Sequence, residues 1–197
     1  MNIAVLISGS GTNLQALIDT ADLGAEIVLV ISDRGRVAGL ARAEAAGIPT
    51  AVVAWRDHQG RESFTAAVCD AVESAGAEAM VLAGFMRILG PEAVRRFPLR
   101  MINVHPALLP AFPGAHAVPQ ALAHGVKLTG VTVHFVDEEV DHGPIILQEV
   151  VPVEAGDTEA ALHARIQMVE HRVLPLAVQA FAAGRLAVRG REVIWSG

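Results

Sequence analysis

The chain has 197 residues, 52% of them hydrophobic and 18% charged, with a formal net charge of −6. This length suits one domain whose core needs no disulfide, and the negative charge argues against a protein that binds a nucleic-acid backbone broadly. Because no apolar run approaches the roughly 20 residues of a membrane span and no basic region precedes the first apolar run, we expect neither a membrane segment nor a signal peptide.

The first half of the chain alternates short apolar runs with alanine-rich segments of helical length. Runs that are rich in β-branched residues and apolar on both faces indicate buried parallel strands, and the segments between them indicate the helices of βαβ units. We therefore predict an α/β fold with a mostly parallel sheet and helices on both faces. The expected strands are Asn2–Ile7, Glu26–Ser32, Thr50–Trp55 and Ala79–Gly84, and the expected helices cover residues 13–21, 37–47 and 61–76.

The second half has a different pattern. A short helix is expected near Pro91, and Met101–Val104 reads as a fifth strand that enters a proline-rich loop. The segments Lys127–Val136 and Pro144–Val153 alternate like strands and are joined by a short acidic turn, which predicts an antiparallel pair. The sheet should therefore be mixed at its C-terminal side.

Two prolines limit the helices of this half. Pro175 falls inside the long helical segment of residues 157–184, where it should kink or interrupt the helix. Pro119 falls inside the helix-like segment after His116, so that helix should begin at about Pro119 itself. The tail after the long helix is expected to form a last strand or a hairpin.

The loop "ISGSGTNLQ" follows the first expected strand and opens the first helix. Its small residues let a backbone approach a ligand closely, and free N–H groups there favour an anion. A dinucleotide fingerprint would place a third glycine where Leu14 stands, although Asp33 lies where a ribose-binding acid would be found. Two alternatives for this loop are the dinucleotide site of an NAD-type oxidoreductase and a tight turn without a ligand. We prefer a monophosphate site at Gly11, Thr12 and Asn13.

The stretch "MINVHPALLPAFPGAH" places two polar residues at the end of the fifth expected strand. Asn103 and His105 are two residues apart, so both side chains project to the same side of a strand. Ligands bind at the carboxyl ends of strands in open α/β sheets. An amide donor beside an imidazole suits the stabilisation of an oxyanion, and the imidazole can also act as a general acid.

Other titratable residues have simpler interpretations. Asp141 lies in a glycine-containing turn, where an acid commonly shapes the turn, yet a carboxylate near His105 would raise the pKa of the imidazole. Cys69 is expected to be a buried helical residue in a reducing, cytoplasmic setting. His134 lies in an expected strand and is ambiguous. The remaining histidines considered are expected to be structural: His58, His124, His163 and His171.

Four segments of the sequence, in this order, resemble the glycinamide ribonucleotide formyltransferase family. They are "ISGSGTNLQ", "LAGFMRIL", "NVHPALLPAFPGAH" and "GVTVHFVDEEVDHGPII". The resemblance covers essentially the whole chain. It implies a single formyltransferase domain over residues 1–197, with a phosphate-binding, Rossmann-like half over 1–100 and a folate-binding, catalytic half over 101–197.

The resemblance also implies an activity and the residues that carry it. The family transfers a formyl group from 10-formyltetrahydrofolate, its co-substrate, to the amine of glycinamide ribonucleotide in the cytoplasm. By motif, Asn103, protonated His105 and Asp141 would be catalytic, with Asp141 raising the histidine pKa. The nucleotide would contact Gly11, Thr12, Asn13, Gln167 and Glu170. The folate would contact Arg61, Leu82, Met86, Arg87, Ile88, Leu89, Asn103, Asp137, Glu138, Glu139, Val140 and Asp141.

The sequence departs from the family at one position of the central motif, since Ala107 replaces a common serine. The implied reaction needs no metal, because two hydrogen-bond donors, Asn103 and His105, and the charge of the protonated imidazole would stabilise the tetrahedral intermediate. No nucleic-acid or membrane partner is expected. Without the resemblance, the segment Met86–Leu89 would read as a strand leaving the core and Glu170 as part of a solvated helix face.

Related activities stay open as alternatives. Methionyl-tRNA formyltransferase normally adds a C-terminal RNA-binding domain, and formyltetrahydrofolate deformylase adds an N-terminal regulatory domain; we expect neither in this chain. A non-catalytic folate- or nucleotide-binding protein would be expected to lose at least one of Asn103, His105 and Asp141, and all three are present.

Overall fold

The computed structural model describes residues 1–196, whose nine strands form one sheet in the order β3-β2-β1-β4-β5-β6-β7-β9-β8. The strands are β1 Asn2–Ile7, β2 Glu26–Ser32, β3 Thr50–Val52, β4 Ala79–Leu82, β5 Met101–His105, β6 Leu128–Phe135, β7 Ile145–Pro152, β8 Leu186–Arg189 and β9 Glu192–Trp195. The helices are α1 Thr12–Ile18, α2 Ala38–Ala45, α3 Arg61–Ser74, α4 Pro91–Arg96, α5 Ala117–His124 and α6 Glu159–Ala182, with a 3₁₀ turn η1 at Trp55–Asp57.

The sheet is mixed, as the sequence predicts. Strands β1 to β5 pair in parallel with one another, and β6 pairs antiparallel with both β5 and β7. The tail forms the β8–β9 hairpin, and β9 joins the sheet beside β7. The carboxyl ends of β1, β2, β4 and β5 therefore meet at one edge, where an open α/β sheet offers its ligand site.

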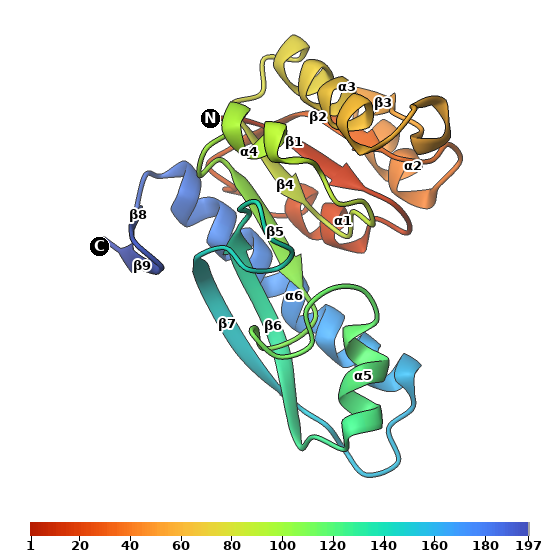
Figure 1. Cartoon of the computed structure of the whole chain (residues 1–197), viewed down its shortest axis with the longest axis vertical. Helices are drawn as coiled ribbons and strands as arrows, with labels where there is room; N and C mark the ends of the chain where they lie inside the picture. The colour runs from red at the N-terminus through yellow and green to blue at the C-terminus, as the bar shows by residue number, and fades with distance from the viewer. Residues whose placement is uncertain (197) are drawn as a thin grey trace.

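Helices cover both faces of the sheet because the strand side chains alternate between two apolar layers. In β1, Ile3, Val5 and Ile7 belong to the layer that contains Leu14 of α1 and residues of α6. Ala4 and Leu6 of the same strand belong to the opposite layer, with Phe64 of α3. In Figure 1, α3 and α4 lie on one face, and α6 runs along the other beside β5 and β6.

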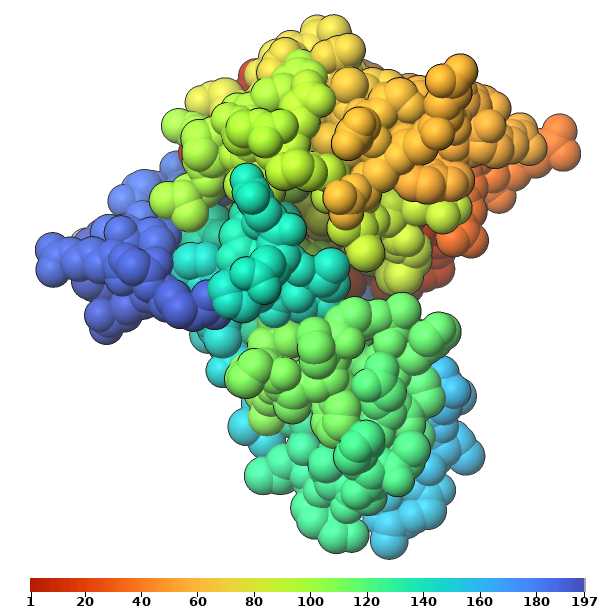
Figure 2. Space-filling view, viewed as in Figure 1, coloured from red at the N-terminus to blue at the C-terminus, as the bar shows by residue number. Residues whose placement is uncertain are grey.

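The molecule narrows near the end of β5. Figure 2 shows a constriction between a larger upper part, which is red to yellow-green with teal and blue segments beside it, and a smaller lower part that is mostly green. The smaller part contains α5, the start of β6 and the end of β7, and α6 spans both parts (Figure 1). Strand β5 ends at this constriction, where the two parts meet (Figure 1).

The end of β3 and the start of α5 differ from the prediction. Strand β3 ends at Val52 instead of Trp55, because its only partner, β2, ends at Ser32, which pairs with Val52. Helix α5 begins at Ala117, which makes Pro119 its third residue; the first four N–H groups of a helix lack partners, so proline removes no bond there.

The long helix is not interrupted at Pro175. Helix α6 continues from Glu159 to Ala182, and Pro175 is buried within it beside Leu174 and Ala177. The apolar contacts of the buried ring stabilise the helix at a position where one backbone hydrogen bond is lost. Of the two expected effects of Pro175, a kink or an interruption, the interruption does not occur.

Candidate active site

Asn103 and His105 end β5 on the same side of the strand, and antiparallel β6 supplies a second pair of polar side chains opposite them. The register sets Asn103 against His134 and His105 against Thr132. His105 and His134 are buried, with 4% and 1% of their surface exposed. Four polar side chains therefore meet at one edge of the sheet, inside an otherwise apolar region.

Asp141 folds back onto this group. Its Oδ2 lies 3.3 Å from His105 Nδ1, and Asn103 Nδ2 donates to its Oδ1 over 3.3 Å. The Gly114 N–H donates to Oδ2 at 2.7 Å, which ties the loop after β5 to the same carboxylate. Asp141 adopts a left-handed backbone conformation with φ 51°. Two side chains of β5 and a backbone N–H of the loop after it thus converge on one carboxylate.

Hydrogen bonding assigns the proton of His134. Its Nδ1 lies 2.7 Å from the Phe135 carbonyl oxygen, an acceptor, so Nδ1 carries the hydrogen. Nε2 then has a free lone pair and accepts a hydrogen bond from Asn103 Nδ2 at 3.1 Å. His134 and Asp141 together hold the Asn103 amide with its N–H groups directed toward the other polar groups of the site.

The pKa of His105 is lowered from its ordinary value because burial disfavours the imidazolium. Asp141 and the Phe112 carbonyl act in the opposite direction but do not outweigh burial. Burial raises the pKa of Asp141, yet His105 and the Gly114 N–H act in the opposite direction, and the net shift is downward. Asp141 is therefore a carboxylate at neutral pH. Each ring nitrogen of His105 faces an acceptor, Asp141 Oδ2 or the Phe112 carbonyl oxygen, while burial acts against the charged ring.

The loop between β5 and α5 covers His105. His105 Nε2 donates to the Phe112 carbonyl oxygen over 2.8 Å, and Phe112 has a positive φ of 53°. Thr132 holds the start of this loop, since its hydroxyl donates to the Ala107 carbonyl and accepts from the Leu109 N–H. For His105 Nε2 to reach a substrate oxygen, the hydrogen bond to Phe112 has to break.

The expected phosphate loop is closely packed against α2. Gly11 has a φ of +70°, and a Cβ at this position would lie 2.5 Å from the Gly39 Cα. The Gly39 N–H donates to the Gly9 carbonyl, and Arg42 Nε donates to the Ser10 carbonyl at 2.9 Å. Only glycine satisfies both the backbone conformation and the close approach at position 11.

Helix α6 brings Glu170 to this loop. Asn13 Nδ2 donates to Glu170 Oε2 at 2.9 Å, and Asn13 Oδ1 is buried without a partner among the described residues. Glu170 is 6% exposed, and burial raises its pKa above the ordinary value. Gln167 lies three residues earlier on α6 and so on the same helix face. The solvated helix face expected from residues alone was wrong for Glu170.

The segment after β4 crosses the ends of β1 and β2. The Met86 N–H donates to Ser8 Oγ at 2.8 Å, and Arg87 Nε donates to Asp33 Oδ2 at 2.8 Å. Met86 and Ile88 are 65% and 55% exposed, which is unusual for large apolar side chains beside a polar cluster. The expected folate wall is thus an exposed apolar strip, with buried Leu82 and half-buried Leu89 behind it.

The two remaining parts of the expected folate site are Arg61 and the loop Asp137–Asp141. Arg61 begins α3, and its Nε lies 3.9 Å from where a Cβ would stand on Gly90. On the other side, the loop Asp137–Asp141 exposes Glu138, Glu139 and Val140. The His142 ring contacts Asp137, and Arg191 of the β8–β9 turn donates to the His142 carbonyl at 2.6 Å.

Asp33 is not available to a nucleotide ribose. Its side chain is fully buried, and its Oδ2 is paired with Arg87 at 2.8 Å and with Arg34 at 3.5 Å. Leu14, at the place of the third glycine in a dinucleotide fingerprint, is also fully buried in the core. Both observations count against the oxidoreductase alternative.

From the sequence alone, Thr132 has no expected role and His134 is ambiguous. Both lie on one face of β6, two residues apart, as Asn103 and His105 do on β5. The same period of two in "TVHF" is the signal that marks them, once β5 and β6 are taken as neighbours.

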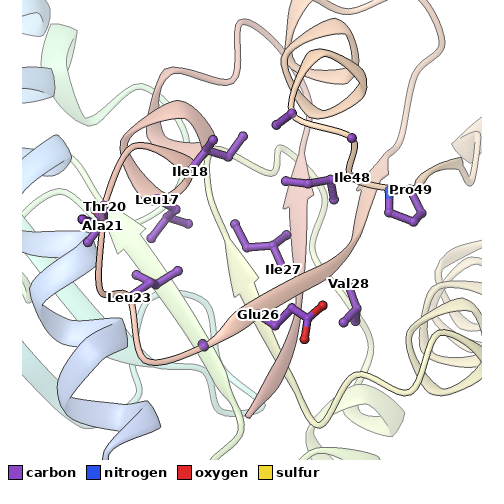
Figure 3. A pocket seen from close by; sticks show the side chains of 13 residues that line it. Leu17, Ile18, Thr20, Ala21, Leu23, Glu26, Ile27, Val28, Ile48 and Pro49 are labelled. Atoms are coloured by element: carbon purple, nitrogen blue, oxygen red, sulfur yellow. The ribbon is translucent and has the colours of Figure 1, made fainter.

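A cavity of about 670 Å³ lies far from these residues. It is lined mainly by apolar side chains of α1, the start of β2 and the segment before β3, including Leu17, Ile18, Leu23 and Ile27 (Figure 3). Glu26 is the one acidic residue that lines this cavity, which lies at the amino ends of the strands, opposite the polar cluster.

None of the helices in residues 1–196 has the length and apolar character that a membrane span requires.

The sequence matches the formyl transferase family model over residues 1–178. The phosphoribosylglycinamide formyltransferase of Mycobacterium tuberculosis is 47% identical over 97% of this chain and 92% of its own length. The corresponding protein of Escherichia coli K12 is 44% identical, over 94% and 89%. The human trifunctional purine biosynthetic protein adenosine-3 is 49% identical over 98% of this chain, which spans only 20% of that protein.

Solved structures agree with the sequence comparisons. Glycinamide ribonucleotide transformylase 1 from Symbiobacterium toebii has a TM-score of 0.97 at 46% identity, covering 100% of this chain and 94% of that one. A formyltetrahydrofolate deformylase from Pseudomonas syringae has a TM-score of 0.92 at 31% identity, and this chain covers 66% of it. The fold is shared by both, while the sequence lies nearer the transformylase. The chain belongs to the formyl transferase family.

Proposed function

We propose that this protein transfers the formyl group of 10-formyltetrahydrofolate to the amine of glycinamide ribonucleotide, a step of de novo purine (IMP) biosynthesis. The products are N-formylglycinamide ribonucleotide and tetrahydrofolate. The observation that carries the proposal is the convergence of Asn103, His105 and Asp141 between a glycine-rich loop and an exposed apolar strip. The relatives named phosphoribosylglycinamide formyltransferase, which align along nearly their whole length, favour this reaction.

The nucleotide is assigned to the loop after β1 and to α6. Backbone N–H groups of Gly11, Thr12 and Asn13 would hold the phosphate, because small residues allow an anion to approach the backbone. Glu170, fixed by Asn13, would accept hydrogen bonds from the ribose hydroxyls, with Gln167 beside it. The buried, unpartnered Asn13 Oδ1 supports a ligand donor at this place.

The folate is assigned to the strip after β4. Met86, Ile88 and Leu89, with Leu82 behind them, would contact its rings, and Arg61 and Arg87 would face its anionic end. The loop Asp137–Asp141 would cover the pterin. Exposed Met86 and Ile88 would then be buried by the ligand, which accounts for apolar surface at this position.

The reaction begins when the substrate amine attacks the formyl carbon and the formyl oxygen becomes an oxyanion. Asn103 Nδ2 would exchange its hydrogen bond to Asp141 or His134 for one to this oxygen. The imidazolium of His105 would donate a second hydrogen bond to it. Burial lowers the pKa of His105, and Asp141 acts in the opposite direction, so the charged ring would depend on Asp141. Asp141 would stabilise that imidazolium.

The intermediate collapses when the bond between the formyl carbon and the folate nitrogen breaks. The attacking nitrogen loses one proton and the leaving folate nitrogen gains one, and a water held by Asp141 would relay it. The Phe112 carbonyl has to release His105 before the oxyanion can form, so the loop after β5 would move when the ligands bind. The scheme uses no metal. The single buried Cys69 suits a cytoplasmic enzyme.

The second candidate function is hydrolysis of the same donor, because a deformylase shares the fold. The test is to mix the protein with 10-formyltetrahydrofolate, with and without glycinamide ribonucleotide, and to follow tetrahydrofolate. Product that forms only with the nucleotide supports the transferase. Product that forms equally without it supports the hydrolase and refutes the proposal.

A further inference from the structure

The β8–β9 hairpin contacts the loop that carries Asp141. Arg191, at the turn of this hairpin, donates from Nη2 to the His142 carbonyl oxygen over 2.6 Å. His142 follows Asp141 directly in the sequence, so the bond lies one residue away from the carboxylate of the site. The family model matches residues 1–178, and the hairpin of residues 186–195 lies beyond that segment. Membership of the family therefore says nothing about this contact.

A second contact of Arg191 fixes the His142 ring. Asp137 Oδ2, an acceptor, lies 2.8 Å from His142 Nδ1, so Nδ1 carries the hydrogen. Nε2 then has a free lone pair and accepts a hydrogen bond from Arg191 Nη1 at 3.1 Å. One guanidinium thus holds both the ring and the backbone of a single residue, which fixes its position and its orientation together. We call this pair of bonds the Arg191 clamp.

The hairpin that carries the clamp is anchored on β7, just after the loop. Strand β9 pairs with β7 at Ile145. The Trp195 indole N–H donates to the Ile146 carbonyl oxygen at 3.0 Å. Arg191 is therefore presented to His142 from strands that are fixed to the sheet, and not from a free tail.

The backbone on either side of His142 has unusual geometry. Asp141 has a left-handed conformation with φ 51°, which costs energy for a residue with a side chain. On the other side, a Cβ at Gly143 would overlap the Phe135 carbonyl oxygen, so the chain passes closely against the end of β6. Without the clamp, the backbone at His142 is free to relax, and Asp141 moves with it.

We propose that Arg191 and His142 are positioning residues, through which the β8–β9 hairpin holds Asp141 against His105. The inference rests on the proposed function, because it concerns the carboxylate that stabilises the imidazolium. The bonds of Arg191 go to His142, so it acts on His105 only through Asp141. At an effective dielectric constant of about 20, moving the carboxylate by about 1 Å from its 3.3 Å distance lowers the pKa of His105 by up to about 1 unit.

The test is NMR titration of His105 in the unliganded full chain, with Arg191 unchanged, Arg191→Ala and Arg191→Lys. We expect the pKa of His105 to fall by about 0.3 to 1 unit in Arg191→Ala, since Asn103 and the Gly114 N–H still hold the carboxylate. Loss of a positive charge by itself would raise this pKa, so a fall reports the moved carboxylate. Lysine keeps the charge but cannot bind ring and carbonyl together, so Arg191→Lys should lie between the other two.

Two controls separate the clamp from charge and from its neighbours. Arg189→Ala removes the same charge from an exposed position of the same hairpin and should not lower the pKa of His105. Asp137→Asn keeps an oxygen that accepts from His142 Nδ1, so the clamp and the pKa of His105 should persist. His142→Gln offers an amide in place of the ring and should come closer to the unchanged chain than His142→Ala does.

Kinetics give a readout that a loss of stability does not move selectively. Arg191→Ala should lower kcat about twofold to tenfold, because each pKa unit corresponds to a tenfold change in the charged imidazole. The KM for the folate should rise with it, and the KM for the nucleotide should stay the same. Equal changes in both KM values would point to general destabilisation and contradict the inference.

The titration also separates this inference from the proposed function. A fall in the pKa of His105 that Arg191→Ala shows and Arg189→Ala does not supports the clamp, even in a protein without transfer activity. An unchanged or raised pKa in Arg191→Ala, or an equal fall in Arg189→Ala, overturns the inference. If formyl transfer then still occurs, the proposed function stands without it.

Discussion

The link between Asp141 and His105 gives the sharpest prediction. Asp141→Asn removes a negative charge 3.3 Å from His105 Nδ1 and keeps the shape of the side chain. At an effective dielectric constant of about 20, unit charges at 3.3 Å attract by about 5 kcal/mol, a ceiling of about 3 to 4 pKa units. Since the carboxylate is partly open to solvent, we expect the pKa of His105 to fall by about 1 to 3 units.

Two measurements check this prediction. NMR titration of the imidazole reports the pKa directly, and the pH dependence of kcat reports its effect on the reaction. Asp141 favours the charged imidazole, so activity that needs this form should fall at a lower pH in the variant. At neutral pH the loss should be about tenfold to a thousandfold, because each pKa unit corresponds to a tenfold change.

The control is Asp137→Asn, which changes an acid of the same loop that contacts His142. It should leave the pKa of His105 and the pH dependence unchanged. An unchanged His105 pKa in Asp141→Asn, or a pH profile that moves to higher pH, would refute the reasoning.

Three further predictions concern the residues around this cluster. Glu170→Gln should raise Tm at neutral pH, because burial penalises the charged form of Glu170 and raises its pKa. The same change should raise the KM for the nucleotide about tenfold to a hundredfold, because a carboxylate that accepts from the ribose is lost. Arg191→Ala should raise the KM for folate about threefold to tenfold and spare the nucleotide KM, since Arg191 holds the loop that begins at Asp137. Gly11→Ala should lower Tm and abolish measurable nucleotide binding, because the added Cβ meets Gly39, whereas Gly9→Ala meets nothing within 4 Å and should keep its stability.

The contradicting results for Glu170→Gln, Arg191→Ala and Gly11→Ala are as specific as the expected ones. The stability gain of Glu170→Gln should grow from acid toward neutral pH: a raised folded-state pKa means that stability is lost as pH rises through it. A gain that is independent of pH would count against burial as the cause. Normal folate KM in Arg191→Ala would show that the β8–β9 turn does not position the loop. Equal behaviour of Gly11→Ala and Gly9→Ala would remove the steric account of the loop.

Much of the fold follows from local sequence patterns. The apolar runs of β1, β2, β4 and β5 are continuous because both sheet faces are covered, and that composition is visible in the sequence. The shared side of Asn103 and His105 follows from the period of a strand alone. The end of β3 could not be predicted, since it depends on where its partner β2 stops.

The assembly of the site depends on contacts between distant residues. Asp141 reaches His105 only because the turn between β6 and β7 gives it a left-handed conformation, which an aspartate adopts in a minority of turns. Glu170 meets Asn13 across 157 positions, through the packing of α6 against α1. The low pKa of His105 arises from its burial, whereas the local sequence draws attention only to the opposing charge.

The central claim is that Asn103 and His105 together stabilise the oxyanion during formyl transfer. Single-turnover rates of Asn103→Ala and His105→Ala, with both substrates saturating, test it most directly. We predict that each variant loses on the order of 10² to 10³ in rate, with modest change in the affinity for either substrate. Near-normal turnover in either variant would contradict the account.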